Sequence, residues 1–142
     1  MIVVDASVFN KLFLDEPDRP QAQALFRHAI QHDIPLFAPQ LLLYEVLSTA
    51  LHYQVPFGEV HELLALQRAA GMRLVEPSLA VIRRAQEIAT SGNAKAGHPA
   101  LEDCIYHALA LEAGALFVTA DRKHVAKTKP FGGIQLLADW KG

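Results

Sequence analysis

Short apolar segments alternate with helical segments along almost the whole chain, and this alternation limits the possible folds more than any other feature of the sequence. Strands are expected at 1–5, 34–38, 72–75, 115–119 and 134–137. Helices are expected at 20–32, 40–53 (opened by Pro39), from the break at 56–58 to about 70, 78–90 and 101–113. Because strands separated by helices form parallel sheets covered on both faces, we expect an α/β sandwich with a mainly parallel sheet.

The 142 residues suit one domain spanning 1–142, because domains of about 100–150 residues are the commonest size. A single cysteine, Cys104, excludes a disulfide framework and a cysteine-rich zinc site. No apolar run is long enough to span a membrane, and the first residues carry no basic segment typical of a signal peptide. We therefore expect a soluble, cytoplasmic protein. The formal net charge of −2 indicates no overall basic coat for nucleic acid.

Four acidic residues stand at the ends of apolar elements. Asp5 is the only charged residue among the first ten, and it ends the first strand. Glu45 is the only Asp, Glu, Lys or Arg between residues 34 and 58, in a helix where an unpaired carboxylate is costly. Asp103 lies in the first turn of the helix at 101–113, and Asp121 closely follows the strand at 115–119. Taken singly, Asp5 and Asp121 could be helix caps and Asp103 a residue favoured by the helix dipole.

The expected topology brings these four acids to one place. The carboxyl ends of parallel strands share one edge of the sheet, where ligands usually bind. Two charges about 5 Å apart repel by roughly 3 kcal/mol at an effective dielectric near 20. Some of the acids must therefore be protonated, or a cation must lie among them. Oxygen ligands favour Mg²⁺ or Mn²⁺, which can activate a water for attack on a phosphodiester.

The sequence around each acid resembles one known family. The segments are Val-Val-Asp-Ala-Ser-Val at 3–8, the isolated Glu45, Glu-Asp-Cys-Ile-Tyr-His-Ala-Leu-Ala at 102–110, and Leu-Phe-Val-Thr-Ala-Asp-Arg-Lys at 116–123. In order and spacing they resemble the PIN-domain ribonucleases, and in particular the VapC toxins of toxin–antitoxin pairs. The resemblance covers essentially the whole chain. Its most specific parts are the helix that carries Asp103 and the Thr-x-Asp that ends at Asp121.

The resemblance implies a PIN-like three-layer sandwich and an endoribonuclease that depends on Mg²⁺ or Mn²⁺. Its acidic quartet maps onto Asp5, Glu45, Asp103 and Asp121 as catalytic and metal-binding residues. The polar residues of its first and last motifs map onto Ser7 and Thr119. VapC proteins typically pair with a small VapB-like antitoxin and form homodimers, so both partners are expected here.

A basic stretch at 122–129 follows Asp121 directly and contains His124. Arg122, Lys123 and Lys127 could hold RNA phosphates beside the acids, although a solvated surface helix would show the same pattern. Asn10 could touch the edge of the site or simply start a local helix. His107 with His98 would be the pair for a zinc site, but the seven histidines show no HExxH-like cluster and no cysteine pair supports it. A long loop is expected at 91–99.

Other functions fit the sequence less well. A haloacid-dehalogenase-like phosphatase needs a second Asp two residues after Asp5, where this chain has Ser7. A phosphorylated receiver domain needs paired acids after the first strand, and residues 1–10 contain one acid. A PIN-like nuclease that is not a toxin, or an RNA-binding module without cleavage, remains the open alternative.

Overall fold

Five parallel strands form the centre of the computed structural model, which describes residues 1–92 and 97–142. Their order across the sheet is β3-β2-β1-β4-β5, and every neighbouring pair is parallel. The strands are β1 (Ile2–Val4), β2 (Leu36–Pro39), β3 (Arg73–Val75), β4 (Leu116–Thr119) and β5 (Ile134–Leu136). β1 is central, since Val3 is in register with Phe37 of β2 and with Phe117 of β4.

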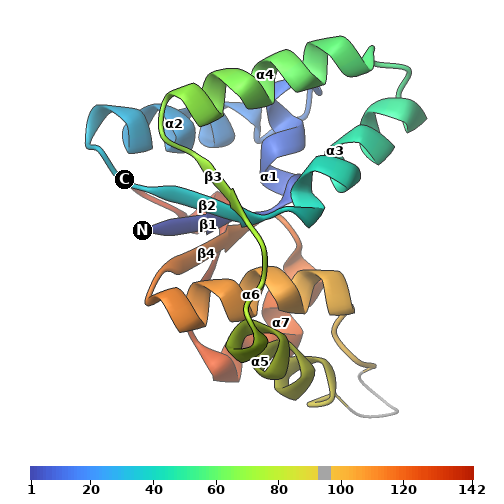
Figure 1. Cartoon of the computed structure of the whole chain (residues 1–142), viewed down its shortest axis with the longest axis vertical. Coiled ribbons are helices and arrows are strands. Elements are labelled where there is room, and N and C mark those ends of the chain that lie inside the picture. The colour runs from blue at the N-terminus through green and yellow to red at the C-terminus, as the bar shows by residue number, and fades with distance from the viewer. Residues whose placement is uncertain (93–96) are drawn as a thin grey trace.

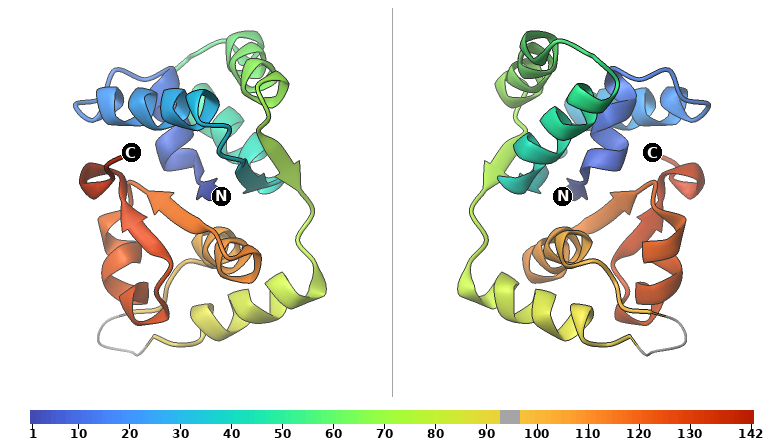
Figure 2. Two further views of the ribbon diagram at one scale, coloured as in Figure 1. Left: turned by 90° about the vertical axis from the view of Figure 1, so that its left-hand side faces the viewer. Right: turned by 90° about the vertical axis from the view of Figure 1, so that its right-hand side faces the viewer.

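Helices cover both faces of this sheet (Figure 1). One face carries α1 (Ala6–Phe9), α2 (Arg19–Gln31), α3 (Leu41–His52) and α4 (Phe57–Ala69). The other carries α5 (Leu79–Ala89), α6 (Leu101–Ala113) and α7 (Arg122–Thr128). The segment after β3 crosses from one helical layer to the other (Figure 2). The predicted three-layer α/β sandwich is confirmed, and the sheet is parallel throughout the described residues.

The core follows from the apolar strands. Val3, Val4, Phe117 and Val118 are fully buried between the two helical layers. α6 is buried on two sides, as its all-round apolar sequence predicts. One side packs against the sheet, and the other packs against α5 in a second apolar cluster. This double burial fixes the helix that presents Asp103.

Local signals fix the ends of several helices. The Ser78 side chain caps α5 by accepting a hydrogen bond from the backbone N–H of Val81. Gly114 ends α6 with a φ of 65°, a left-handed conformation that glycine adopts without steric cost. The chain then turns directly into β4. The N-terminal turn of α6 therefore lies at the carboxyl edge of the sheet.

Some local predictions were wrong or untested. Pro39 is the last residue of β2 and does not open α3, which begins at Leu41, because proline without an N–H is tolerated at a strand end. The four-residue helix α1 is too short to show an apolar period, and the sequence pattern does not predict it. Of the loop expected at 91–99, residues 93–96 lie outside the described residues. Across the described ranges, none of the helices has the length and apolar character needed to cross a membrane.

Candidate active site

The site lies where the chain changes direction across the sheet. From β1 the chain adds β2 and β3 on one side, and later β4 and β5 on the other. The crossovers therefore diverge at the carboxyl ends of β1 and β4, and such switch points form crevices in parallel sheets. Asp5 directly follows β1, and Asp121 follows Thr119, the last residue of β4.

Asp5 is held rigidly at this crevice. Its side chain is buried, with 4% exposure, and it caps α1. Oδ1 accepts hydrogen bonds from Ser7 Oγ at 2.5 Å and from the Val8 N–H at 3.2 Å, and Oδ2 accepts one from Thr119 Oγ1 at 2.5 Å. Burial raises the pKa of Asp5 despite these hydrogen bonds, with a smaller contribution from the charge of Asp121. Burial thus favours the protonated form of Asp5 unless a cation lies beside the carboxylate.

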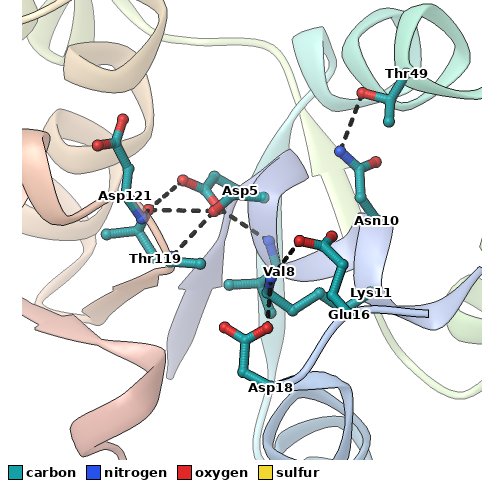
Figure 3. Close-up of polar contacts among 11 residues, drawn as sticks. Asp5, Val8, Asn10, Lys11, Glu16, Asp18, Thr49, Thr119 and Asp121 are labelled. Atoms are coloured by element: carbon teal, nitrogen blue, oxygen red, sulfur yellow. Dashed lines mark hydrogen bonds and ion pairs between the residues drawn. The ribbon is translucent and has the colours of Figure 1, made fainter. Parts of the chain in front are cut away.

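Two hydroxyl groups connect the turn after β1 to the turn after β4. Ser7 Oγ also accepts a hydrogen bond from the Ala120 N–H at 3.0 Å, and Thr119 Oγ1 accepts one from the Asp121 N–H at 3.1 Å. Thr119 is fully buried, and the two hydroxyl oxygens lie 3.4 Å apart. Figure 3 shows Thr119 and Asp121 beside the Asp5 carboxylate. Ser7 and Thr119, the two polar residues to which the resemblance points, thus each donate a hydrogen bond to Asp5 and each accept one from the turn after β4.

Glu45 approaches the crevice from α3. Its Oε1 accepts a hydrogen bond from the hydroxyl of Tyr106 in α6 at 2.5 Å. Burial is the main reason that the pKa of Glu45 is raised, and repulsion from Asp5 and Glu102 adds to it. The sequence did not single out Tyr106. Its one signal is its position on the same helix as Asp103, three residues later, in an otherwise apolar segment.

Asp103 and Asp121 complete the group, which we call the four-acid site (Asp5, Glu45, Asp103 and Asp121). Burial raises the pKa of Asp103 to about 7, with further contributions from repulsion by Asp5, Asp121 and Glu45 and from a hydrogen bond to Asp121. Asp121 caps α7, because its Oδ1 accepts the N–H groups of Lys123 and His124 at 3.0 and 3.1 Å. The structure therefore brings four acids, from segments far apart in the sequence, into mutual electrostatic interaction.

The donor set suits a hard divalent cation. The charged groups of the four-acid site are all carboxylates, the ligands that Mg²⁺ and Mn²⁺ favour. Within residues 1–92 and 97–142, no three His, Cys, Asp or Glu side chains are arranged to hold a metal ion by themselves. Mg²⁺ commonly keeps several waters and binds through one or two carboxylates together with a substrate phosphate. The site fits such a hydrated ion better than a metal enclosed entirely by protein ligands.

The histidines do not form the zinc pair. His107 is fully buried, and its Nε2 donates to the carbonyl oxygen of Gly132 at 2.7 Å, whereas His98 is exposed. His124 is also buried, at 3% exposure, with its ring 5.6 Å from that of His107. Burial, followed by the charge of His107, lowers the pKa of His124 to about 4. His124 is therefore neutral at pH 7 and does not belong to the surface basic stretch.

Without His124, the basic residues beside Asp121 are the three predicted to contact RNA. Arg122, Lys123 and Lys127 are all exposed on α7. Lys127 Nζ donates to the carbonyl oxygen of His98 at 3.4 Å. The stretch thus places positive charge next to the four-acid site.

Comparison with known proteins identifies the family. A model of the PIN domain matches residues 2–129. The chain belongs to the PIN domain family. PIN domains are generally nucleases, and they usually use divalent metal ions.

A solved structure supports the same fold for this PIN domain. It is described as the crystal structure of PAE2754 from Pyrobaculum aerophilum, with a TM-score of 0.62 and 22% sequence identity. The similarity covers 96% of this chain and 90% of the other. At this identity the similarity concerns the fold alone. A search of the curated proteins finds no match to the chain.

Proposed function

We propose that this PIN domain is an endoribonuclease that depends on Mg²⁺ or Mn²⁺, and that it is the toxin of a VapBC-type pair. The observation that carries the proposal is the convergence of Asp5, Glu45, Asp103 and Asp121 at the switch point of the sheet. The resemblance of the flanking segments to VapC toxins supports the finer assignment.

Each acid has a distinct part in this proposal. Asp5, Asp103 and Asp121 would hold the divalent ion directly or through water, and Glu45 would either join them or orient the attacking water. When bound, the ion neutralises charge on the phosphodiester and lowers the pKa of water. Attack by water leaves a 5′-phosphate and a 3′-hydroxyl, and it does not use the 2′-hydroxyl of the substrate. RNA preference therefore has to come from binding.

The surrounding residues keep the acids in place. Ser7 and Thr119 hold the two oxygens of Asp5, and Tyr106 holds Glu45. Arg122 and Lys123, in the first turn of α7 after Asp121, would contact phosphates on either side of the cleaved bond. Lys127 extends this basic surface along the helix.

The protein partners are proposed from the resemblance and from the surface of α3 and α4. Large apolar side chains are exposed there, including Tyr44 at 68%, Leu51 at 69% and Leu66 at 61%. Exposed apolar surface of this kind marks protein-binding sites. We propose that a VapB-like antitoxin and a second copy of the chain use such surfaces.

The decisive experiment is cleavage of a mixed RNA pool by the purified protein. Cleavage is expected with Mg²⁺ or Mn²⁺, and it should be lost with EDTA or in Asp121→Ala. Glu112→Gln is the matched control, because this acid is on the far end of α6 and pairs with Arg84. Cleavage that survives both EDTA and Asp121→Ala would contradict the metal-dependent mechanism. Tight RNA binding without cleavage would instead indicate a binding module.

The toxin role needs a separate test in cells. Expression of the chain should stop growth, and Asp121→Ala should not. Co-expression of the product of a short neighbouring reading frame should restore growth. Normal growth during expression of an active nuclease would contradict the toxin role and leave the nuclease assignment standing.

A further inference from the structure

A pocket of about 440 Å³ opens directly beside the four-acid site. Asp121 of that site and Ser7, which contacts Asp5, line one side of the pocket. The pocket extends from there toward the C-terminal end of α3. Asn10, Thr49 and Tyr53 line its other side. A group bound there would lie next to a phosphodiester held at the acids.

Asn10 is the feature of this pocket that the proposed chemistry does not use. The residue is only 9% exposed, and it lies at the start of the short helix η1 (Asn10–Leu12). Its Nδ2 donates to Thr49 Oγ1 at 3.1 Å, whereas its Oδ1 is buried and has no partner in the described parts of the chain. A buried amide oxygen without a donor is costly, and such atoms usually have a functional reason.

The orientation of the Asn10 amide is set by its neighbour. Thr49 Oγ1 donates its proton to the carbonyl oxygen of Glu45 at 3.2 Å, so it must accept the hydrogen bond from Asn10. This directs Nδ2 to Thr49, as Figure 3 shows, and leaves Oδ1 as the free acceptor of a side chain that lines the pocket. Terminal amide torsions are broad, so rotation of the amide can turn Oδ1 toward a donor bound in the pocket. The same contacts connect the pocket to the helix turn that carries Glu45.

The charges of the pocket favour a hydrogen-bond donor over a phosphate. Among the described residues, Lys11 is the one basic side chain that lines it. Lys11 is 4% exposed, and its Nζ is held by Asp18 at 2.7 Å and Glu16 at 3.3 Å. Its charge is thus already compensated, and Asp121 adds a further negative charge to the wall. The pocket presents acceptors and repels anions.

The last feature of the pocket is the aromatic side chain of Tyr53. It follows the last residue of α3, lines the pocket and is 59% exposed. An exposed aromatic ring at the mouth of a polar pocket is a stacking surface for a nucleobase. An aromatic ring and a hydrogen-bond acceptor that line the same pocket fit a planar group that carries N–H donors.

We propose that this pocket binds the nucleobase beside the cleaved phosphodiester, with Tyr53 stacking on the base and Asn10 Oδ1 accepting a hydrogen bond from its exocyclic amine. The inference rests on the proposed RNA cleavage for its biological meaning, since it assigns the base preference of that site. Adenine, cytosine and guanine carry such an amine, and uracil does not. At position 4, where cytosine carries its amine, uracil has a carbonyl oxygen that Asn10 Oδ1 would repel, so uracil is the rejected base.

Nucleoside binding tests the pocket without metal, phosphate or cleavage. The full chain, labelled with ¹⁵N, is titrated with cytidine and with uridine in EDTA and followed by NMR. The two nucleosides differ at position 4, where cytidine has an amine and uridine a carbonyl oxygen. Cytidine is expected to bind about tenfold more tightly, with the largest shifts around Asn10, Thr49 and Tyr53. Equal affinities, or no binding of either nucleoside, would overturn the proposal.

Variants separate the two contacts. Tyr53→Ala is a surface change and should weaken cytidine binding about fivefold or more. Ile82→Ala, at an exposed apolar residue of α5 outside the pocket, should leave cytidine binding unchanged. Asn10→Leu should reduce cytidine binding to the level of uridine, and Asn10→Asp, which keeps an acceptor there, should retain the preference. A preference that survives Asn10→Leu, or binding that survives Tyr53→Ala, would overturn the assignment.

These results are independent of the proposed function. Selective cytidine binding by a protein that cleaves no RNA would support the pocket and contradict the nuclease assignment. RNA cleavage by a protein that binds cytidine and uridine equally would support the nuclease and overturn the pocket.

Discussion

Asp103→Asn should stabilise the metal-free protein while abolishing its activity. The pKa of Asp103 is raised from 3.8 to about 7, chiefly by burial and then by repulsion from Asp5. The folded chain thus binds this proton more tightly than the unfolded chain does. Folding stability consequently falls as the pH rises from about 4 to about 7, and the variant avoids that loss. Above this range the wild-type carboxylate is ionised at a cost that asparagine does not have.

The size of the effect can be bounded from the shift. One pKa unit corresponds to about 1.36 kcal/mol, so the full shift sets a ceiling of roughly 4 kcal/mol. Asp103 is only partly buried, and solvent screening and the shared charges of the site reduce this value. We expect a gain of about 1–2 kcal/mol, which raises the melting temperature by about 3–6 °C for a domain of this size.

The assay is thermal and urea unfolding in EDTA, from about pH 4 to about pH 8. Glu102→Gln is the matched control, because Glu102 is the exposed neighbour in the same first turn of α6. Each of the two changes removes one acid from a helix N-terminus, which costs about 0.3–1 kcal/mol, so their difference isolates the effect of the site. Mg²⁺ should then raise the melting temperature of the wild type more than that of Asp103→Asn.

Two results would refute this reasoning. If Asp103→Asn is neutral or destabilising at about pH 8 in EDTA, burial and the neighbouring acids do not destabilise the ionised Asp103 carboxylate as the geometry requires. If the gain is the same at about pH 4, it does not come from ionisation. A loss of stability in Glu102→Gln would not contradict the prediction, even one as large as the gain in Asp103→Asn. The control removes only the favourable interaction of an acid with the helix N-terminus.

Three further changes test individual contacts. Tyr106→Phe removes the hydrogen-bond donor to Glu45 but keeps the ring stacked on Phe117. RNA cleavage should therefore fall about 10–100-fold with an unchanged melting temperature. An unaffected cleavage rate would show that the hydroxyl is dispensable. Lys11→Met leaves the two acids that pair with Lys11 uncompensated. The free energy of unfolding, measured in urea, should therefore fall by about 1–3 kcal/mol. A stabilised variant would contradict this. Because the pKa of His124 is lowered from 6.5 to about 4, the wild type should lose stability as the pH falls through that range. His124→Phe should lose less, and identical acid unfolding curves would be the contrary result.

The sequence predicts the parts of this molecule that depend on periodicity and on strand order. Asp5 and Asp121 could be placed at one edge because each follows a buried strand, and parallel strands end on the same side. The contact between Tyr106 and Glu45 could not be predicted, because it joins residues 61 positions apart and depends on how α3 and α6 cross the sheet. The burial of His124 was missed for a related reason. In a seven-residue helix, one inward face can hold a histidine while its cationic neighbours point outward.

The same acids serve both the fold and the proposed chemistry, and this affects how their variants should be interpreted. Asp5 caps α1 and Asp121 caps α7, so replacing either by alanine removes a cap worth about 1 kcal/mol together with a carboxylate. Loss of activity in those variants therefore combines two causes. Asp103 and Glu45 cap no helix, and their removal instead relieves the cost of burying a charge and the repulsion between the acids. Variants at Asp103 and Glu45 that are inactive yet more stable would identify the four-acid site as a functional feature maintained against the stability of the fold.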